Sequence, residues 1–402
     1  MDANGFPYIG IRDIREDGTL DFSSARFVSE NAVSKQEAAF TVNEGDILFC
    51  KVGTLGEPRH VRLEGSRFAL SATLVLIKIG CNLLNKFSKY VLESDFLNAQ
   101  INPILTGATR PALGIQQIRK FSIPRPPYDE LVEIVKFLDK NVGLIDQAIA
   151  LKNNQVSLFK ERKQILIQQA VTRGLVSGVP MRDSGIEWIG EIPAHWRVLA
   201  NRALFQERVE AGRDDLPLLS VSIHSGVSEE EISEEENVRG RAKIEDKSKY
   251  IRVRPGDIAF NMMRAWQGAI GAVRVEGMVS PAYTIATPRP SLDARYFEYQ
   301  YRTPGFIQQM DRYSKGITDF RKRLYWDGFK QLTTLVPPIE EQRAIIDFIE
   351  QAMRKQNTAV ILLERQISKL KEYKAILINC AVTGNIKVPG VADPVISNIE
   401  VT

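Results

Sequence analysis

The chain repeats itself after 211 residues, and this repeat constrains its fold more than any other feature of the sequence. Residues 160–167 read KERKQILI and residues 371–378 read KEYKAILI, and each segment is followed, after two further residues, by Ala-Val-Thr. The same offset relates residues 127–137 to residues 338–348 without a gap, with proline, glutamate, isoleucine and phenylalanine recurring at matched positions. Internal self-similarity is the sequence signature of repeated structural units, so we expect two similar halves with internal pseudo-twofold symmetry.

Each copy contains a stretch with the periodicity of a long coiled-coil helix. Between residues 131 and 170 apolar side chains recur at alternating intervals of four and three, and only Lys152 and Lys163 interrupt the series. The stripe shifted by 211 residues is almost as regular. A sustained heptad pattern with charged residues between the apolar positions is typical of coiled-coil packing. We therefore expect two long antiparallel helices that pack their apolar stripes against each other.

Similar signals mark both ends of the two predicted helices. A Pro-Pro pair at residues 126–127 and another at 337–338 precede the first turns, where acidic side chains then complement the helix dipole. Gly174 and Gly384 follow the last apolar positions, as is typical of helix C-termini. At about 1.5 Å per residue, some 45 residues would make each helix roughly 68 Å long.

The segments outside the helices have the composition of mixed α/β domains. Short alternating or β-branched runs, such as residues 68–79 and 250–260, are separated by glycine and proline. The expected fold class is therefore α+β, with two similar mixed domains separated by two long antiparallel coiled-coil helices. The expected boundaries are 1–126 for the first domain, 127–182 for the central helix, 183–335 for the second domain and 336–402 for the C-terminal helix and tail.

The two halves differ at their beginnings. The second half opens with residues 183–196 (DSGIEWIGEIPAHW), and about 30 residues pass before the region that aligns with Met1. The first half contains no counterpart to this stretch. We expect a first domain that is naturally shortened, that belongs to a fragment, or that borrows the missing element from elsewhere.

The net charge and the cysteine spacing limit the classes of function that this chain can have. The net charge of +4 does not by itself indicate a nucleic-acid binder, although residues 239–254 are rich in lysine and arginine. Cys50, Cys81 and Cys380 show no paired spacing, which argues against a disulfide framework or a zinc site. No apolar run is long enough to cross a bilayer and no signal-peptide profile is present, so we expect a cytoplasmic protein without a membrane partner.

The sequence lacks the motifs of an autonomous enzyme. The three histidines lie in unrelated contexts, and the chain has neither a P-loop nor a glycine-rich nucleotide loop after a strand. Residues 125–128 (RPPY) are similar to the catalytic loop of amino-methyltransferases, but Arg125 cannot accept the hydrogen bond that such a loop takes from its target amine. We expect no catalytic residue, no metal site and no cofactor bound by this chain.

Two pairs of loops supply candidate contacts to nucleic acid. One pair follows the repeated Gly-Asp-Ile runs at 45–47 and 256–258, and the other consists of basic, glycine-containing stretches at 107–110 and 316–323. Arginine side chains can fork onto guanine or phosphate oxygen atoms. The expected DNA-binding residues are Arg12, Lys51, Thr109, Arg110, Arg264, Lys315, Thr318, Arg321 and Arg323.

Three elements together resemble the DNA specificity subunit of Type I restriction-modification systems. These are the opening of the second half at 183–196, the Pro-Pro-Ile-Glu-Glu-Gln helix start at 337–342, and the repeated helix ends at 160–174 and 371–384. Together they cover both helical repeats and the start of the second domain.

This resemblance implies a non-catalytic subunit with two target recognition domains, each reading one half of a bipartite, asymmetric site in double-stranded DNA. It also implies that two methyltransferase subunits, which use S-adenosylmethionine, dock on the helices, and that restriction subunits add translocation and cleavage with ATP and Mg. The implied subunit-interface residues are Glu130, Phe137, Lys160, Lys163, Glu341, Phe348, Lys371 and Lys374.

Two other functions are compatible with parts of the pattern. A coiled-coil scaffold whose α/β domains bind protein ligands would also use long amphipathic helices. An autonomous nuclease or methyltransferase would instead predict activity from the purified chain alone.

Overall fold

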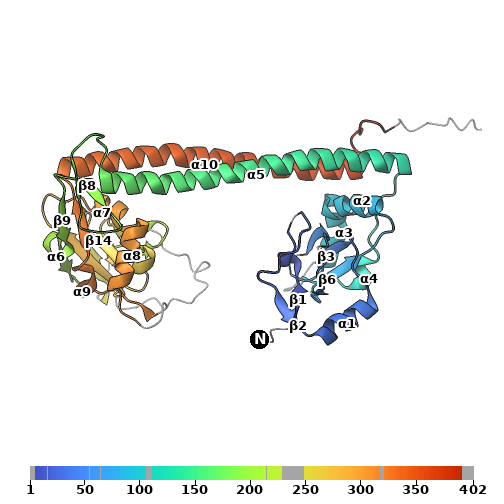
Figure 1. Cartoon of the computed structure of the whole chain (residues 1–402), viewed down its shortest axis with the longest axis horizontal. Helices are drawn as coiled ribbons and strands as arrows, with labels where there is room; N and C mark the ends of the chain where they lie inside the picture. The colour runs from blue at the N-terminus through green and yellow to red at the C-terminus, as the bar shows by residue number, and fades with distance from the viewer. Residues whose placement is uncertain are drawn as a thin grey trace, which may run out of the picture. The chain divides into compact units, whose positions relative to one another are not determined.

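The computed structural model describes residues 5–391 except residues 16, 54, 64, 106–110, 214, 229–248 and 317–320. The chain divides into two compact units, one formed by residues 1–154 with 363–402 and the other by residues 155–362. Each unit contains one α/β domain and a part of each long helix (Figure 1). Within the described part of the chain, none of the helices combines the length and apolar character needed to cross a membrane.

Two long helices occupy the positions that the heptad pattern predicts. Helix α5 spans Tyr128–Arg173 and helix α10 spans Ile339–Val382, so that their first residues are 211 positions apart. Both begin directly after a Pro-Pro pair and carry two acidic side chains in the first turn. Every position of both predicted apolar stripes is buried or half-buried. The prediction of two long amphipathic helices is therefore confirmed.

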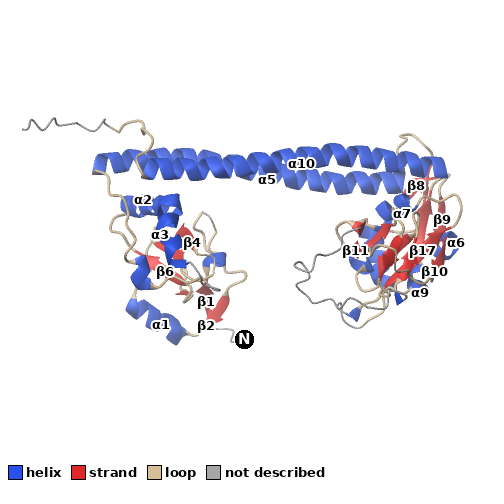
Figure 2. Ribbon diagram, turned by 180° about the vertical axis from the view of Figure 1, so that it is seen from behind, coloured by secondary structure: helices blue, strands red, loops and turns tan. Residues whose placement is uncertain are grey.

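The helices pack on each other in antiparallel fashion within each unit. In the first unit the beginning of α5 shares a hydrophobic cluster with the end of α10, and Lys374 of α10 donates hydrogen bonds of 2.7 and 2.8 Å to the carboxylate of Asp146 on α5. In the second unit the end of α5 shares the main core with the beginning of α10, where Val171 and Ile346 are fully buried. Figure 2 shows both helices as continuous ribbons.

The domain of the first unit contains two small sheets. One sheet has the strand order β2-β1-β5 and the other has the order β4-β3-β6, with β3 antiparallel to both neighbours. The strands are β1 (Phe6–Ile9), β2 (Arg26–Val28), β3 (Ile47–Cys50), β4 (Gly56–His60), β5 (Ala69–Leu70) and β6 (Leu74–Ile77). The helices are η1 (Ile11–Asp13), α1 (Glu30–Ala39), α2 (Asn82–Glu93), α3 (Asp95–Leu105) and α4 (Ile115–Ile118).

The domain of the second unit is built around a four-stranded antiparallel sheet of order β10-β17-β14-β15. Its strands are β10 (Phe205–Arg208), β14 (Ile258–Asn261), β15 (Ile270–Ala272) and β17 (Tyr283–Pro288). The described residues of the unit also form four strand pairs: β7 (Met181–Asp183) with β8 (Glu191–Pro193), β9 (Arg197–Ala200) with β18 (Thr333–Val336), β11 (Ser220–Ser222) with β12 (Gly226–Ser228), and β13 (Ile251–Val253) with β16 (Gly277–Val279). The helices are α6 (Asn201–Leu204), η3 (Ala265–Gln267), α7 (Ala294–Tyr301), α8 (Pro304–Tyr313) and α9 (Trp326–Phe329).

The sequence repeat is a repeat of local structure. Strands β3 and β14 begin 211 residues apart and are buried at all four positions, and short helices α4 and α9 also begin 211 residues apart. Both units therefore contain an equivalent central strand and an equivalent short helix.

The repeated Gly-Asp-Ile run forms the same turn before each of these strands. The carboxylate of Asp46 accepts a 2.7 Å hydrogen bond from the N–H of Asn43, and that of Asp257 accepts a 2.9 Å bond from the N–H of Arg254. The preceding glycines adopt positive φ angles of 77° and 92°, which favour glycine. The motif is thus a structural turn that starts a buried strand.

The opening segment of the second half anchors that unit. The ring of Trp188 meets the ring of Phe306 edge-on at 4.9 Å, and Trp196 is buried in the main core. His195 Nε2 lies 2.8 Å from a carboxylate oxygen of Glu341 at the start of α10. Both tryptophans therefore help to hold this segment in the core of the unit. The remaining tryptophans, Trp266 and Trp326, lie in the same unit.

Candidate nucleic-acid interface

Two loops distant in the sequence lie side by side in the second unit. One loop follows β14 and contains Met262 and Arg264, and the other follows α8 and ends at Leu324. The N–H of Leu324 donates a 2.8 Å hydrogen bond to the carbonyl of Met262, which joins the two loops. Within the second loop, Lys315 and Arg323 exchange backbone hydrogen bonds of 2.9 and 2.8 Å. The two candidate loops of the second half therefore lie next to each other and form one edge of this domain.

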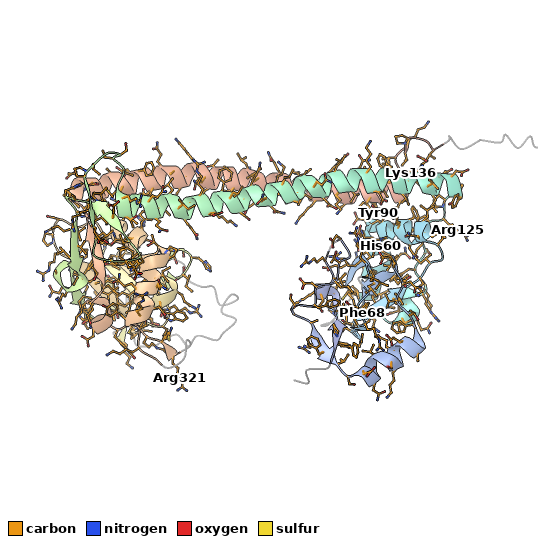
Figure 3. The ribbon with its side chains drawn as sticks, viewed as in Figure 1. His60, Phe68, Tyr90, Arg125, Lys136 and Arg321 are labelled. Atoms are coloured by element: carbon orange, nitrogen blue, oxygen red, sulfur yellow. The ribbon has the colours of Figure 1, made fainter. Side chains whose placement is uncertain are left out.

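This edge carries a group of basic side chains. Arg264, Lys315 and Arg321 are exposed, whereas Arg323 is half-buried and donates a 3.0 Å hydrogen bond to the carbonyl of Lys322. Figure 3 shows the side chain of Arg321 pointing outward from the domain. Thr318 lies outside the described residues. Cations presented on connected loops are suited to phosphate and base contacts.

The half-buried Lys322 supports this edge from within. Its ammonium group lies 5.3 Å from the centroid of the Trp266 ring and donates a 2.7 Å hydrogen bond to the carboxylate of Asp311 on α8. These contacts join the loop after β14, the loop after α8 and the helix itself. Lys322 therefore connects the basic edge to Trp266 and to α8.

A glycine shapes the second loop. Gly316 has a φ angle of 152°, and a Cβ atom at this position would lie 2.6 Å from the carbonyl oxygen of Arg321. Any larger residue would therefore displace the backbone that presents Arg321. The local backbone conformation of this predicted basic loop therefore requires glycine at position 316.

The first unit repeats the same connection. The N–H of Leu113 donates a 2.8 Å hydrogen bond to the carbonyl of Lys51, and these two residues precede Leu324 and Met262 by 211 positions. A further bond of 3.3 Å joins the N–H of Gly53 to the carbonyl of Pro111. Lys51 is half-buried at the end of β3.

The other residues predicted to bind DNA in the first half lie in two places. Arg12 is exposed on η1, which contacts β3. Thr109 and Arg110 belong to the segment 106–110, outside the described residues. The structure thus brings the loop that begins at Lys51 next to the chain that leads into Leu113.

The other basic stretch noted in the sequence is engaged inside the unit. Arg252 and Arg254 each donate to Glu210, at 2.8 and 2.9 Å, and Arg208 Nε lies 3.1 Å from the buried carboxylate of Asp257. These arginines therefore tie strands together. Residues 239–248 of the basic stretch lie outside the described part of the chain.

The predicted subunit-interface residues have different surroundings. Lys160, Lys371 and Phe348 are exposed, and Glu130 is half-buried. Phe137 packs against the hydrophobic cluster of the first unit. Glu341 and Lys374 are bound to His195 and Asp146 within the chain, and Lys163 lines a cavity of the second unit.

The sequence reasoning missed an exposed apolar series on α5. Leu144, Leu151, Leu158 and Ile165 are seven residues apart and have exposed fractions of 56, 67, 55 and 48%. Leu151 also lines a shallow hollow with Gln147, Ala150 and Asn154. We name the four residues the outer stripe of α5. The sequence contains the signal for this stripe, because the four residues recur at a second heptad position next to the position that forms the buried stripe.

Comparisons with known proteins agree with the resemblance found in the sequence. Residues 2–157 match the model of the Type I restriction modification DNA specificity domain. The Type I restriction enzyme MjaVIII specificity subunit of Methanocaldococcus jannaschii is 25% identical over 197 residues, which is 48% of this chain and 41% of that protein. The chain thus spans less than half the length of this curated relative. The resemblance to specificity subunits is confirmed.

Two solved structures were found to be similar over most of this chain. A chain from a structure of a type I R-M system, described in terms of complex assembly and conformational transition, has a TM-score of 0.67 and 16% identity over 95% of this chain and 92% of its own. The HsdS subunit from Thermoanaerobacter tengcongensis has a TM-score of 0.47 and 18% identity, with 95% and 91% of the two chains covered. The first of these likenesses confirms the fold class, with its two mixed domains and two long helices.

Proposed function

We propose that this chain, which carries a Type I restriction modification DNA specificity domain in residues 2–157, is the DNA-recognising subunit of a Type I restriction-modification enzyme. The observation that carries the proposal is the loop connection made twice, by Leu113 with Lys51 and by Leu324 with Met262. Each connection joins the residue that follows the central strand of its domain to a segment distant in the sequence, and in the second domain the joined loops carry Arg264, Lys315 and Arg321. Two such readers fit a bipartite DNA site, with one half-site for each domain.

The two long helices suit the role of a spacer between the readers. Half-sites on one face of a duplex recur at about 34 to 36 Å or multiples of it, and a helix pair fixes a distance better than a flexible linker. Lysine and arginine contacts to phosphate would set the register of each domain, and a few base contacts would specify the sequence. Neither task requires a catalytic group in this chain.

The outer stripe of α5 supports a helical partner. Four large apolar side chains in heptad spacing are exposed, and such faces of helices are normally covered by another protein surface. In this proposal two methyltransferase subunits dock on the helices and bring S-adenosylmethionine, whereas restriction subunits use ATP and Mg²⁺. The assembly acts on cytoplasmic DNA.

A competition assay tests the recognition. The complex reconstituted with its methyltransferase subunits is given labelled genomic DNA fragments, and methylated positions are mapped by sequencing. We expect one bipartite sequence to be methylated, and only duplexes that contain it to compete at moderate salt. Equal competition by random duplexes would overturn the proposal.

An exchange of segments separates DNA reading from scaffolding. Residues 183–334 are replaced by the corresponding segment of a related subunit, and the complex is mapped in the same way. A DNA reader should change one half-site and keep the other. A scaffold whose domains bind protein ligands should leave the methylated sequence unchanged.

A further inference from the structure

A cavity of about 420 Å³ lies within the second unit, and its lining contains none of the residues of the basic loops. It is enclosed by the last third of α5, by α7 and the start of α8, by α10, and by the turn between β11 and β12. Its polar wall includes Lys163, Arg274 and Arg302, and its apolar wall includes Ile167, Ile307 and Met353. A volume of this size can hold a small organic molecule.

The carboxylate in the cavity wall is already engaged. Glu298 is buried, with an exposed fraction of 8%, and its oxygens lie 3.3 Å from Arg274 Nη2 and 3.5 Å from Arg302 Nη1. Burial raises the pKa of Glu298, and the two guanidinium groups oppose that rise. Arg302 also donates to the carbonyls of Ile223 and His224, which fixes its position.

Lys163 adds a third cation without a carboxylate of its own. Burial lowers the pKa of its ammonium group, and the charge of Arg302 lowers it further. No acidic side chain among the described residues lies within 4.0 Å of the Lys163 ammonium group. Three cations therefore face one carboxylate, and the wall carries net positive charge.

The residue that matches Lys163 in the repeat has an acidic partner. Lys374, the matching residue 211 positions later, is paired with Asp146 at 2.7 Å in the first unit. The position that matches Asp146 in the second copy is Asn357, an amide. The internal acid that neutralises one lysine is thus replaced in the other copy, and the unpaired lysine lines a cavity.

We propose that this cavity binds a small organic carboxylate. The carboxylate lies between Lys163 and Arg274, where charge-assisted hydrogen bonds are available, and takes the place of the missing aspartate. The apolar part of the ligand packs on Ile307 and Met353. Inorganic phosphate would leave these apolar groups uncovered, so an apolar monocarboxylate fits both walls.

Titration calorimetry on the full chain tests this with 4-phenylbutyrate as the probe. We expect measurable binding of 4-phenylbutyrate. The neutral 4-phenylbutan-1-ol, which lacks the carboxylate, and phosphate, which lacks an apolar part, should each bind at least about tenfold more weakly. Failure of 4-phenylbutyrate to bind at about 10 mM, or equal binding of the alcohol, would overturn the proposal.

Variants identify the site. Lys163→Met removes the unpaired charge, and Asn357→Asp restores the internal partner seen in the first unit, so each should weaken 4-phenylbutyrate binding at least about tenfold. Arg162→Met, at an exposed neighbouring position outside the cavity, is the charge-matched control and should bind as the parent does. Since Asn357 is exposed, its variant remains informative should Lys163→Met fail to fold. Unchanged binding in Asn357→Asp would contradict the site.

Discussion

Leu324 and Met262 are joined by a 2.8 Å hydrogen bond from the N–H of the first to the carbonyl of the second, and Leu113 and Lys51 are joined in the same way. In each unit this hydrogen bond joins two segments that are distant in the sequence, and both of its atoms belong to the backbone. Because the backbone makes the connection, the side chains on the loops can vary while the loop geometry is kept. A loop geometry that stays the same while its side chains differ is suited to readers of different sequences.

Replacement of Arg321 by alanine should weaken DNA binding about 5- to 30-fold, since this exposed arginine extends from the basic edge. Anisotropy titrations of the reconstituted complex at several salt concentrations measure the effect. A phosphate contact would lower the salt slope by about 1, whereas a base contact would relax the sequence preference at one position. Arg202→Ala, an exposed arginine of α6, is the matched control. An equal loss in both variants would assign the effect to general charge.

Replacement of Gly316 by alanine should weaken binding at the half-site read by the second domain. The added methyl group would meet the carbonyl of Arg321 at 2.6 Å, so the loop must shift and carry Arg321 with it. The melting temperature should change little because the loop is exposed. Competition with duplexes altered in one half-site measures the effect. Equal losses at both half-sites would show that the loop does not act locally.

The two turn aspartates should differ in their contribution to stability. Asp257→Ala leaves Arg208 and Thr287 without their buried acceptor, so we expect a loss of about 3 to 5 kcal/mol in the free energy of unfolding of its unit. Asp46→Ala removes a bond to Asn43 and an ion pair with the half-exposed Lys78, for which about 1 to 2 kcal/mol is expected. Hydrogen exchange of the β14 and β3 amides measures each unit separately. Equal losses would contradict this account, and the exposed Asp215→Ala serves as the control.

The outer stripe of α5 should be required for partner docking. The double variant Leu151→Glu with Leu158→Glu places two charges on exposed positions, so folding should be unaffected while methyltransferase binding falls at least about tenfold. Gel filtration of the mixed subunits and calorimetry measure the loss. The double variant Asn153→Glu with Gln155→Glu adds the same charge at exposed positions off the stripe. Similar losses in both would argue against a specific apolar contact.

The long helices could be predicted from the sequence because their signals are local. Heptad spacing indicates which face of a helix is buried, and the same spacing recurs in the second copy 211 residues later. Such features need only neighbours in the chain.

The joining of the loops and the cavity could not be predicted, because each depends on contacts between distant residues. The bond between Met262 and Leu324 brings the loop of Arg264 next to that of Arg321. Glu341, predicted as a subunit-interface residue, lies 2.8 Å from His195, a residue 146 positions away, and this contact could not be read from the sequence. The sequence identified the residue types on these loops, and folding decides which of them meet.

The placement of the tryptophans has a practical consequence. All four, at positions 188, 196, 266 and 326, belong to the unit formed by residues 155–362. With excitation selective for tryptophan, the emission of the intact protein therefore comes from that unit alone. A tryptophan introduced into the first unit would provide a second optical probe, so that the melting of the two units could be followed in a single sample.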